Sequence, residues 1–192
     1  LEQHPVPGAV VKKTGVGLMW VKMAEYISRT QIVGYSLIFL CVAVILCIAF
    51  GSLKVGLLSM IPNIAPVVVV LGAMGWLGMH LDYVKLLLAT IAIGIAVDDT
   101  IHYVHRFESE FQMDANYRHS VIRCHGSIGR AIYYTSITIT VGFSILTLSN
   151  FIPTIYFGLL TGLAMILALL GDLLLLPLLI HQFRPLGPER QE

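Results

Sequence analysis

Three titratable side chains lie close together in a mostly apolar stretch, because Asp98, Asp99 and His102 fall within residues 84–104. On a helix His102 lies one turn after both acids, so an acid, acid, imidazole cluster is expected. An ionised Asp at the centre of a membrane-spanning helix costs about 2.5 to 3.5 kcal/mol. Hydrocarbon and a like-charged neighbour both disfavour the charged form of a carboxyl group. Such a pair is therefore suited to taking up and releasing protons near neutral pH.

Two other roles are open to these acids. A purely structural role, in which the acids serve only assembly, needs a Lys or Arg on another helix to neutralise them. The middles of the predicted spans contain no Lys or Arg. A metal site at Asp98, Asp99 and His102 is geometrically possible, but a cluster of this type on one helical turn is unspecific. We predict no metal and no cofactor.

The amino-acid composition indicates whether the helices that carry these acids are surrounded by water or by lipid. Of the 192 residues, 57% are apolar and only 12% are charged, whereas soluble domains carry about 25% charged residues. With a mean hydropathy of +0.83, the sequence is typical of an integral membrane protein surrounded by the lipid bilayer. The net charge of +1 excludes nucleic acid as a partner. The three cysteines, Cys41, Cys47 and Cys124, fit no disulfide or zinc pattern.

The apolar runs predict an all-α polytopic membrane protein with five transmembrane helices, since about 20 apolar residues cross a bilayer. The uncharged stretch 131–171 is too long for one span, and Asn150 and Pro153 supply a turn within it. The five predicted spans are residues 32–50, 56–78, 84–104, 131–149 and 154–180.

The distribution of Lys and Arg predicts the orientation. Most basic residues near span ends would lie on one side, which the positive-inside rule makes cytoplasmic. Residues 1–31 are then the end of an extracytoplasmic domain, residues 32–182 the bundle and residues 183–192 a cytoplasmic tail. Residues 106–130 mix aromatic and charged residues and are expected to form a cytoplasmic interfacial segment or a solvated helical loop.

Several motifs occur in an order that identifies a family. Gly94 precedes Asp98 and Asp99 by one turn, which resembles the GxxxDD signature of the resistance, nodulation and cell division (RND) superfamily. The sequence is most similar to the branch of predicted lipid and hydrophobe exporters that includes the mycobacterial large membrane proteins (MMPL) and the hopanoid transporters. Further matching stretches are Pro62-Asn63-Ile-Ala-Pro66, Gly129-Arg130-Ala-Ile-Tyr-Tyr-Thr135-Ser136, Gly142-Phe143, Phe157-Gly158 and Asp172-Leu-Leu-Leu-Leu-Pro177.

The resemblance implies one half-repeat, the C-terminal one, of a transporter with twelve spans in the bacterial inner membrane. Its partners would be the missing other half of the same transporter, a hydrophobic or lipid-like substrate and, in a homo-oligomer, further copies. By position Asp98 and Asp99 would be the relay acids. The resemblance also gives Thr135, Ser136 and Thr138 as candidate hydroxyl partners of these acids.

Two other polar residues, His102 and Asp172, each have two possible roles. His102 extends the relay, or it caps a helix or bonds a carbonyl. Asp172 is a second ionisable site or bonds a hydroxyl between helices. At least two of the threonine and serine hydroxyls on the fourth span are expected to bond their own helix. Gly94 is expected to let another helix approach the acids, and the GxxxG spacing of Gly158 and Gly162 indicates close helix packing.

Three classes of function compete on this sequence. The first is a proton-driven secondary transporter that exports lipids or other hydrophobic molecules. The alternative is a lipid sensor or regulator without transport, because sterol-sensing domains share the five-helix core. An intramembrane aspartyl protease needs two Asp on different helices with GxGD around one of them. Here the acids are adjacent and Val97 stands where that motif needs glycine, so we do not expect an enzyme.

Overall fold

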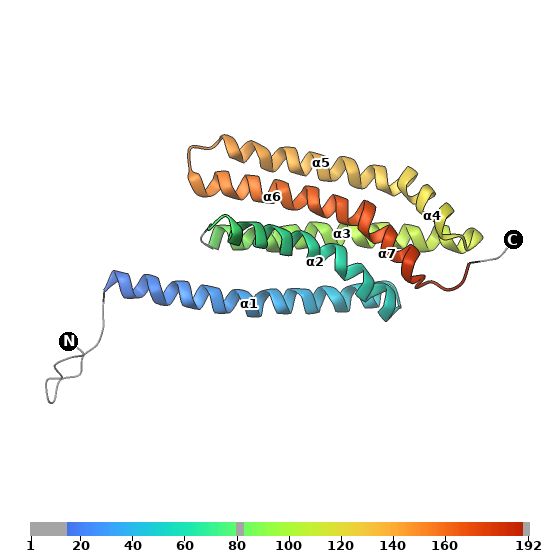
Figure 1. Cartoon of the computed structure of the whole chain (residues 1–192), viewed down its shortest axis with the longest axis horizontal. Helices are drawn as coiled ribbons and strands as arrows, with labels where there is room; N and C mark the ends of the chain where they lie inside the picture. The colour runs from blue at the N-terminus through green and yellow to red at the C-terminus, as the bar shows by residue number, and fades with distance from the viewer. Residues whose placement is uncertain (1–14, 80–82, 190–192) are drawn as a thin grey trace, which may run out of the picture. The chain divides into compact units, whose positions relative to one another are not determined.

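The computed structural model describes residues 15–79 and 83–189 (Figure 1). All regular elements in these residues are helices. In chain order they are α1 (Val16–Ala49), α2 (Leu53–Trp76), α3 (Tyr83–Asp114), α4 (Tyr117–Cys124), η1 (His125–Gly129), α5 (Arg130–Ile145), η2 (Leu146–Leu148), α6 (Ile152–Leu170), η3 (Gly171–Leu175) and α7 (Leu176–Phe183). Here η1 and η3 are π-helical and η2 is a short 3₁₀ turn.

Four helical stretches are long and apolar enough to cross a membrane. They are Leu53–Trp76, Leu87–Asp114, Tyr117–Leu148 and Ile152–Phe183, and Val33–Ala49 is a shorter apolar helix. The predicted all-α polytopic fold is therefore confirmed, and the chain is an integral multi-pass membrane protein. It divides into two compact units, residues 1–36 and 37–192. The site lies entirely in the second unit.

Helix α6 is the centre of this second unit, because it packs against α2, α3 and α5 (Figure 1). Small residues allow the close approach: Ala92 and Ala96 of α3 lie in one buried cluster with Ala164 and Ala168 of α6. In a membrane, where helices gain little from hydrophobic burial, small residues allow the van der Waals contact that holds a bundle together. The core at α6 therefore fixes the position of α3, which carries the acids.

Helices α5 and α6 meet at Gly158. A Cβ added there would lie 2.5 Å from the Phe143 carbonyl oxygen and 2.8 Å from Leu146 Cβ. At Gly162 it would lie 3.5 Å from Ser144 Oγ. The GxxxG spacing thus marks close packing, as the sequence indicates.

The structure departs from the predicted spans mainly at the ends. Helix α3 continues past Val104 to Asp114, and residues 117–129 form α4 and η1, which run directly into α5. The predicted interfacial segment 106–130 is thus helical almost throughout. Of the predicted extracytoplasmic segment, residues 1–14 lie outside the described residues.

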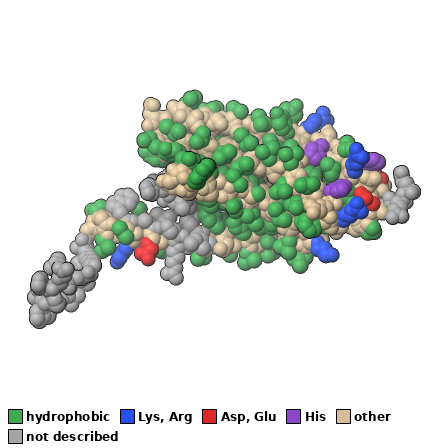
Figure 2. All heavy atoms as spheres, in the orientation of Figure 1, with side chains coloured by type: hydrophobic (Ala, Val, Ile, Leu, Met, Phe, Trp, Pro, Cys, Tyr) green, Lys and Arg blue, Asp and Glu red, His purple; other side chains and the backbone are tan. Residues whose placement is uncertain are grey.

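Charged side chains gather at one end of the second unit, around the α3–α4 corner (Figure 2). Arg123 of α4 donates to Glu110 Oε2 from Nε at 2.6 Å and to both Asp114 carboxylate oxygens at 2.9 and 3.0 Å. Arg106 also pairs with Glu110. We call Arg106, Glu110, Asp114 and Arg123 the polar corner.

Candidate functional site

Asp98 and Asp99 point in different directions from α3. The Asp98 side chain is 73% exposed and lies 3.6 Å from His102, which is 62% exposed. Gly94, one turn earlier, is also exposed, and a Cβ there would meet nothing within 4 Å in the described part of the chain. Gly94, Asp98 and His102 therefore form one open stripe along α3.

Asp99 is half-buried and turns toward α5. Ser136 is buried on α5, and its hydroxyl donates to Asp99 Oδ2 at 3.3 Å. The second acid is thus held by a neighbouring helix, whereas Asp98 contacts a residue of its own helix. This difference follows from the 100° rotation between successive helical residues.

The other two predicted hydroxyl partners bond their own helix. Thr135 donates to the carbonyls of Ala131 and Ile132, and Thr138 donates to the carbonyl of Tyr134. Of the three candidates, Ser136 is the one whose hydroxyl donates to an acid in the described part of the chain. A Ser or Thr hydroxyl within a helix often donates in this way to the carbonyl one turn earlier.

A second polar group lies inside the bundle. Asn63 of α2 donates from Nδ2 to the Ser59 carbonyl at 2.7 Å and to Thr100 Oγ1 at 3.0 Å. Thr100 in turn donates to Asp172 Oδ1 at 2.5 Å. The three residues are at most 1% exposed. We call Asn63, Thr100 and Asp172 the internal polar chain.

The elements around this chain are irregular for identifiable reasons. Pro66 has no N–H to donate to the Pro62 carbonyl one turn earlier, and both prolines lie inside α2. Gly171 opens the π-helical segment η3, and a Cβ there would lie 3.1 Å from the Pro62 carbonyl oxygen. Glycine therefore allows Asp172 to approach α2 closely.

The sequence reasoning missed His125. Its Nε2 lies 2.9 Å from the Leu173 carbonyl oxygen, and its Nδ1 lies 2.9 Å from the Val121 carbonyl oxygen and 3.3 Å from the Tyr103 hydroxyl. Pro177 has no N–H for Leu173, the carbonyl four residues earlier. With its N–H on Nε2, the imidazole of His125 supplies the missing donor to Leu173 and joins η1 to η3.

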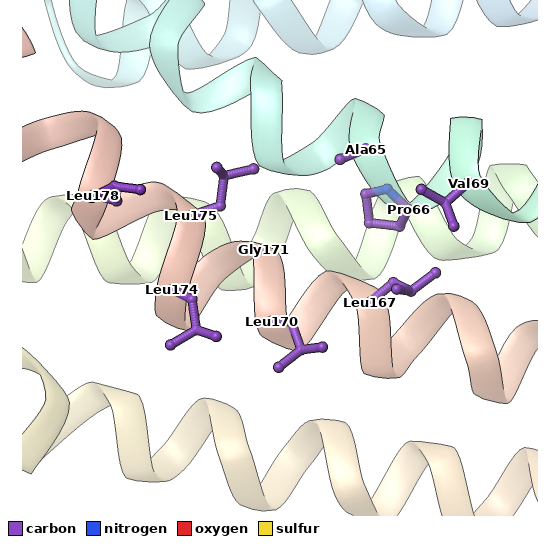
Figure 3. Close-up of a pocket in the computed structure, with 9 residues that line it drawn as sticks. All are labelled: Ala65, Pro66, Val69, Leu167, Leu170, Gly171, Leu174, Leu175 and Leu178. Atoms are coloured by element: carbon purple, nitrogen blue, oxygen red, sulfur yellow. The ribbon is translucent and has the colours of Figure 1, made fainter. Parts of the chain in front are cut away.

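An apolar crevice opens between α2 and the α6–η3–α7 helix (Figure 3). It has a volume of about 320 Å³. Its lining includes Ala65, Pro66, Leu170, Gly171 and Leu174. A hydrocarbon chain is the kind of ligand that such a lining suits, since it offers almost no polar partner.

Together the acids offer two separate places for protons or cations. Asp98 and Asp99 lie at the border between an open face and the interior, and Asp172 lies wholly inside. Within the described residues, no group of three or more His, Cys, Asp or Glu side chains could hold a metal ion.

The chain is similar to known membrane proteins. The model of the MMPL family matches residues 1–190. A membrane protein of Methanocaldococcus jannaschii is 26% identical over 181 residues, which cover 94% of this chain and 47% of that protein. The hopanoid transporter HpnN of Burkholderia multivorans is 28% identical over 190 residues, which cover 95% of this chain and 21% of that protein. The chain thus spans less than half the length of these relatives. No solved structure matches.

Proposed function

Because the chain belongs to the MMPL family, we propose that it is part of a proton-driven secondary transporter that exports lipids or other hydrophobic molecules. The family and the similarity to a hopanoid transporter support the class of cargo. The apolar crevice beside α2 supports it too, because an acyl or polycyclic chain fits its lining. Asp98 and Asp99 supply the coupling to protons.

The exposure of Asp98 is the observation that carries this proposal. Asp98 lies about 16 Å along the helix from Leu87, where the apolar part of α3 begins, and about 12 Å from Arg106, the first Lys or Arg after it. Neither distance lets a short Asp side chain reach a membrane surface. A carboxylate at this depth that faced lipid would be costly. The stripe of Gly94, Asp98 and His102 is therefore covered by further protein, which we assign to the other half of the transporter.

The two acids then have different roles in a proton relay. Asp99 keeps contact with α5 through Ser136, and Asp98 faces the interface with the other half, with His102 beside it. A proton bound at this border changes the charge between the two halves. Moving one charge across the membrane is worth about 2.3 kcal/mol per 100 mV. Protonation can therefore shift how the halves pack and so drive export.

The charge distribution supports an orientation for this transport. The polar corner places Arg106 and Arg123 at the same end of the bundle as the C-terminal end of α7, because α4 packs against both α3 and α7. By the positive-inside rule this end is cytoplasmic. In a bacterial cell the membrane would be the inner membrane.

A lipid sensor without transport is the second candidate, and the apolar crevice alone fits it equally well. The acids favour the transporter. A sensor has little need for two adjacent carboxyl groups at mid-membrane, one of them open to a partner.

The test uses the full-length protein reconstituted in liposomes with an imposed proton gradient. We expect Asp98→Asn and Asp99→Asn each to reduce gradient-driven export of a fluorescent lipid by at least about tenfold. Glu108→Gln is the matched control, because it removes a carboxylate from the same helix beyond the apolar part. Gradient-driven export by the Glu108→Gln variant should stay near the wild-type level. Undiminished export in both Asp variants would overturn the proposal.

A further inference from the structure

Two buried oxygen atoms of the internal polar chain have no hydrogen-bond partner. They are Asn63 Oδ1 and Asp172 Oδ2, and each belongs to a side chain that is 1% exposed. Buried polar atoms are nearly always paired, and an unpaired one costs about 1 to 3 kcal/mol. Two such atoms in one hydrogen-bonded chain therefore point to a ligand that can be shared by oxygen atoms.

With Asp172 ionised, the hydrogen atoms of this chain are all in use. Both N–H groups of Asn63 are donated, one to the Ser59 carbonyl and one to Thr100. The Thr100 hydroxyl is donated to Asp172. The bond to Ser59 also fixes which end of the Asn63 amide is oxygen, because a carbonyl can only accept. What remains free on Asn63 and Asp172 is acceptor capacity.

A backbone oxygen adds to this set. Pro66 cannot donate to the Pro62 carbonyl, which lies against Gly171, the residue before Asp172. In secondary transporters, carbonyls of interrupted helices together with side-chain oxygens coordinate sodium ions near the middle of the membrane. Here α2 continues as one helix through Pro62 and Pro66, which leaves the Pro62 carbonyl without its usual donor, and a π-helical segment joins α6 to α7.

We propose that Asn63, Thr100 and Asp172, with the Pro62 carbonyl, bind a sodium ion inside the bundle. The charge selects a monovalent ion. Asp172 is the one carboxylate of the set, and the buried residues in the described part of the chain include no Lys or Arg. One sodium ion neutralises one carboxylate, whereas a divalent ion would leave a positive charge in hydrocarbon.

This site lies deeper than Asp98, because its residues lie inside the second unit while Asp98 lies on the open face. Asp99 directly precedes Thr100, and its charge also acts on Asp172. An ion here would tie α2, α3 and η3 together and would stabilise the folded bundle by mass action. The inference therefore stands or falls without the transport proposal.

The experiment measures the melting temperature of the purified full-length protein in detergent, in sodium chloride and in choline chloride at equal ionic strength. For the wild-type protein we expect the melting temperature to rise with sodium concentration and to reach a plateau. Asp172→Asn should remove this rise. Thr100→Val, which keeps the carboxylate but removes one oxygen, should weaken the apparent affinity for sodium by about tenfold, and Thr100→Ser should retain it.

A direct binding measurement and a control variant complete the experiment. Binding of radioactive ²²Na⁺ to the same samples detects the ion directly, so the test does not depend on the stability of the variants. Glu108→Gln should bind sodium as wild type does. The proposal is overturned if sodium and choline give the same melting temperature and no ²²Na⁺ binds, or if ²²Na⁺ binding survives in Asp172→Asn.

Discussion

The Thr100 hydroxyl donates to Asp172 Oδ1 across 2.5 Å, which joins α3 to η3 inside the bundle. Thr100→Val keeps the shape of the side chain but leaves the carboxyl of Asp172 without this donor. In sodium-free buffer we expect a loss of unfolding free energy of about 1 to 2 kcal/mol, the upper part of the range for hydrogen bonds between membrane helices. Thermal unfolding in detergent measures it. Thr100→Ser keeps the hydroxyl and should lose much less; an equal loss would mean that the bond contributes nothing.

His125 should stabilise the junction of η1 and η3 because it satisfies the Leu173 carbonyl. His125→Ala leaves that carbonyl without the donor that Pro177 cannot supply, at an expected cost of about 1 to 3 kcal/mol. A denaturation series in detergent gives this free energy.

Pro177→Ala provides the control for His125, because it restores an N–H one turn after Leu173. In a double-mutant cycle we expect the cost of His125→Ala to be smaller in the Pro177→Ala background. A cost that is the same in both backgrounds would show that His125 acts through another contact, such as the Tyr103 hydroxyl.

Gly158 should not tolerate a side chain. Its added Cβ would lie 2.5 Å from a backbone oxygen of the facing helix, which cannot move without shifting α5. We expect Gly158→Ala to lower the unfolding free energy by about 1 to 3 kcal/mol, the range for overpacking. Gly72→Ala is the matched control, because Gly72 lies inside α2 and a Cβ there would meet nothing within 4 Å in the described part. It should be neutral or stabilising, since Ala is the better helix former. Equal losses in the two variants would contradict the packing at Gly158.

Arg123 should hold the α3–α4 corner in a way that Lys cannot reproduce. Its planar guanidinium reaches Glu110 and both carboxylate oxygens of Asp114, which a single ammonium group cannot do. We expect Arg123→Lys to speed hydrogen exchange at the amides of α4, and Arg118→Lys, an exposed change on the same helix, to leave them near wild type. Unchanged exchange in Arg123→Lys would show that charge alone is sufficient.

The fold class and the presence of acids within apolar spans could be predicted from the sequence, because charge in an apolar run is visible without knowing any partner. Asp98 and Asp99 stand out in this way, and so does Asp172. For Asp172 the sequence left a second ionisable site and an interhelical hydrogen bond both open, and the structure adds the bond from Thr100. Its role as an ionisable site stays a prediction.

The partners of these residues could not be predicted, because they depend on how helices pack. Asn63 appears in the sequence only as part of a proline-rich motif, and its contact with Thr100 exists because α2 and α3 lie side by side. His125 is hidden for another reason. It lies in a segment whose composition suggests an interface, and hydropathy does not reveal the π-helical turns that bring it to Leu173.

The open stripe of Gly94, Asp98 and His102 also bears on biogenesis. A nascent helix that carries an uncovered acid at mid-membrane partitions poorly from the translocon into lipid. In the proposed transporter, α3 would therefore be retained beside the insertion machinery until it packs against the other half. Pairing of the halves would then be the late, committing step of maturation, and an orphan half would be a substrate for membrane quality-control proteases.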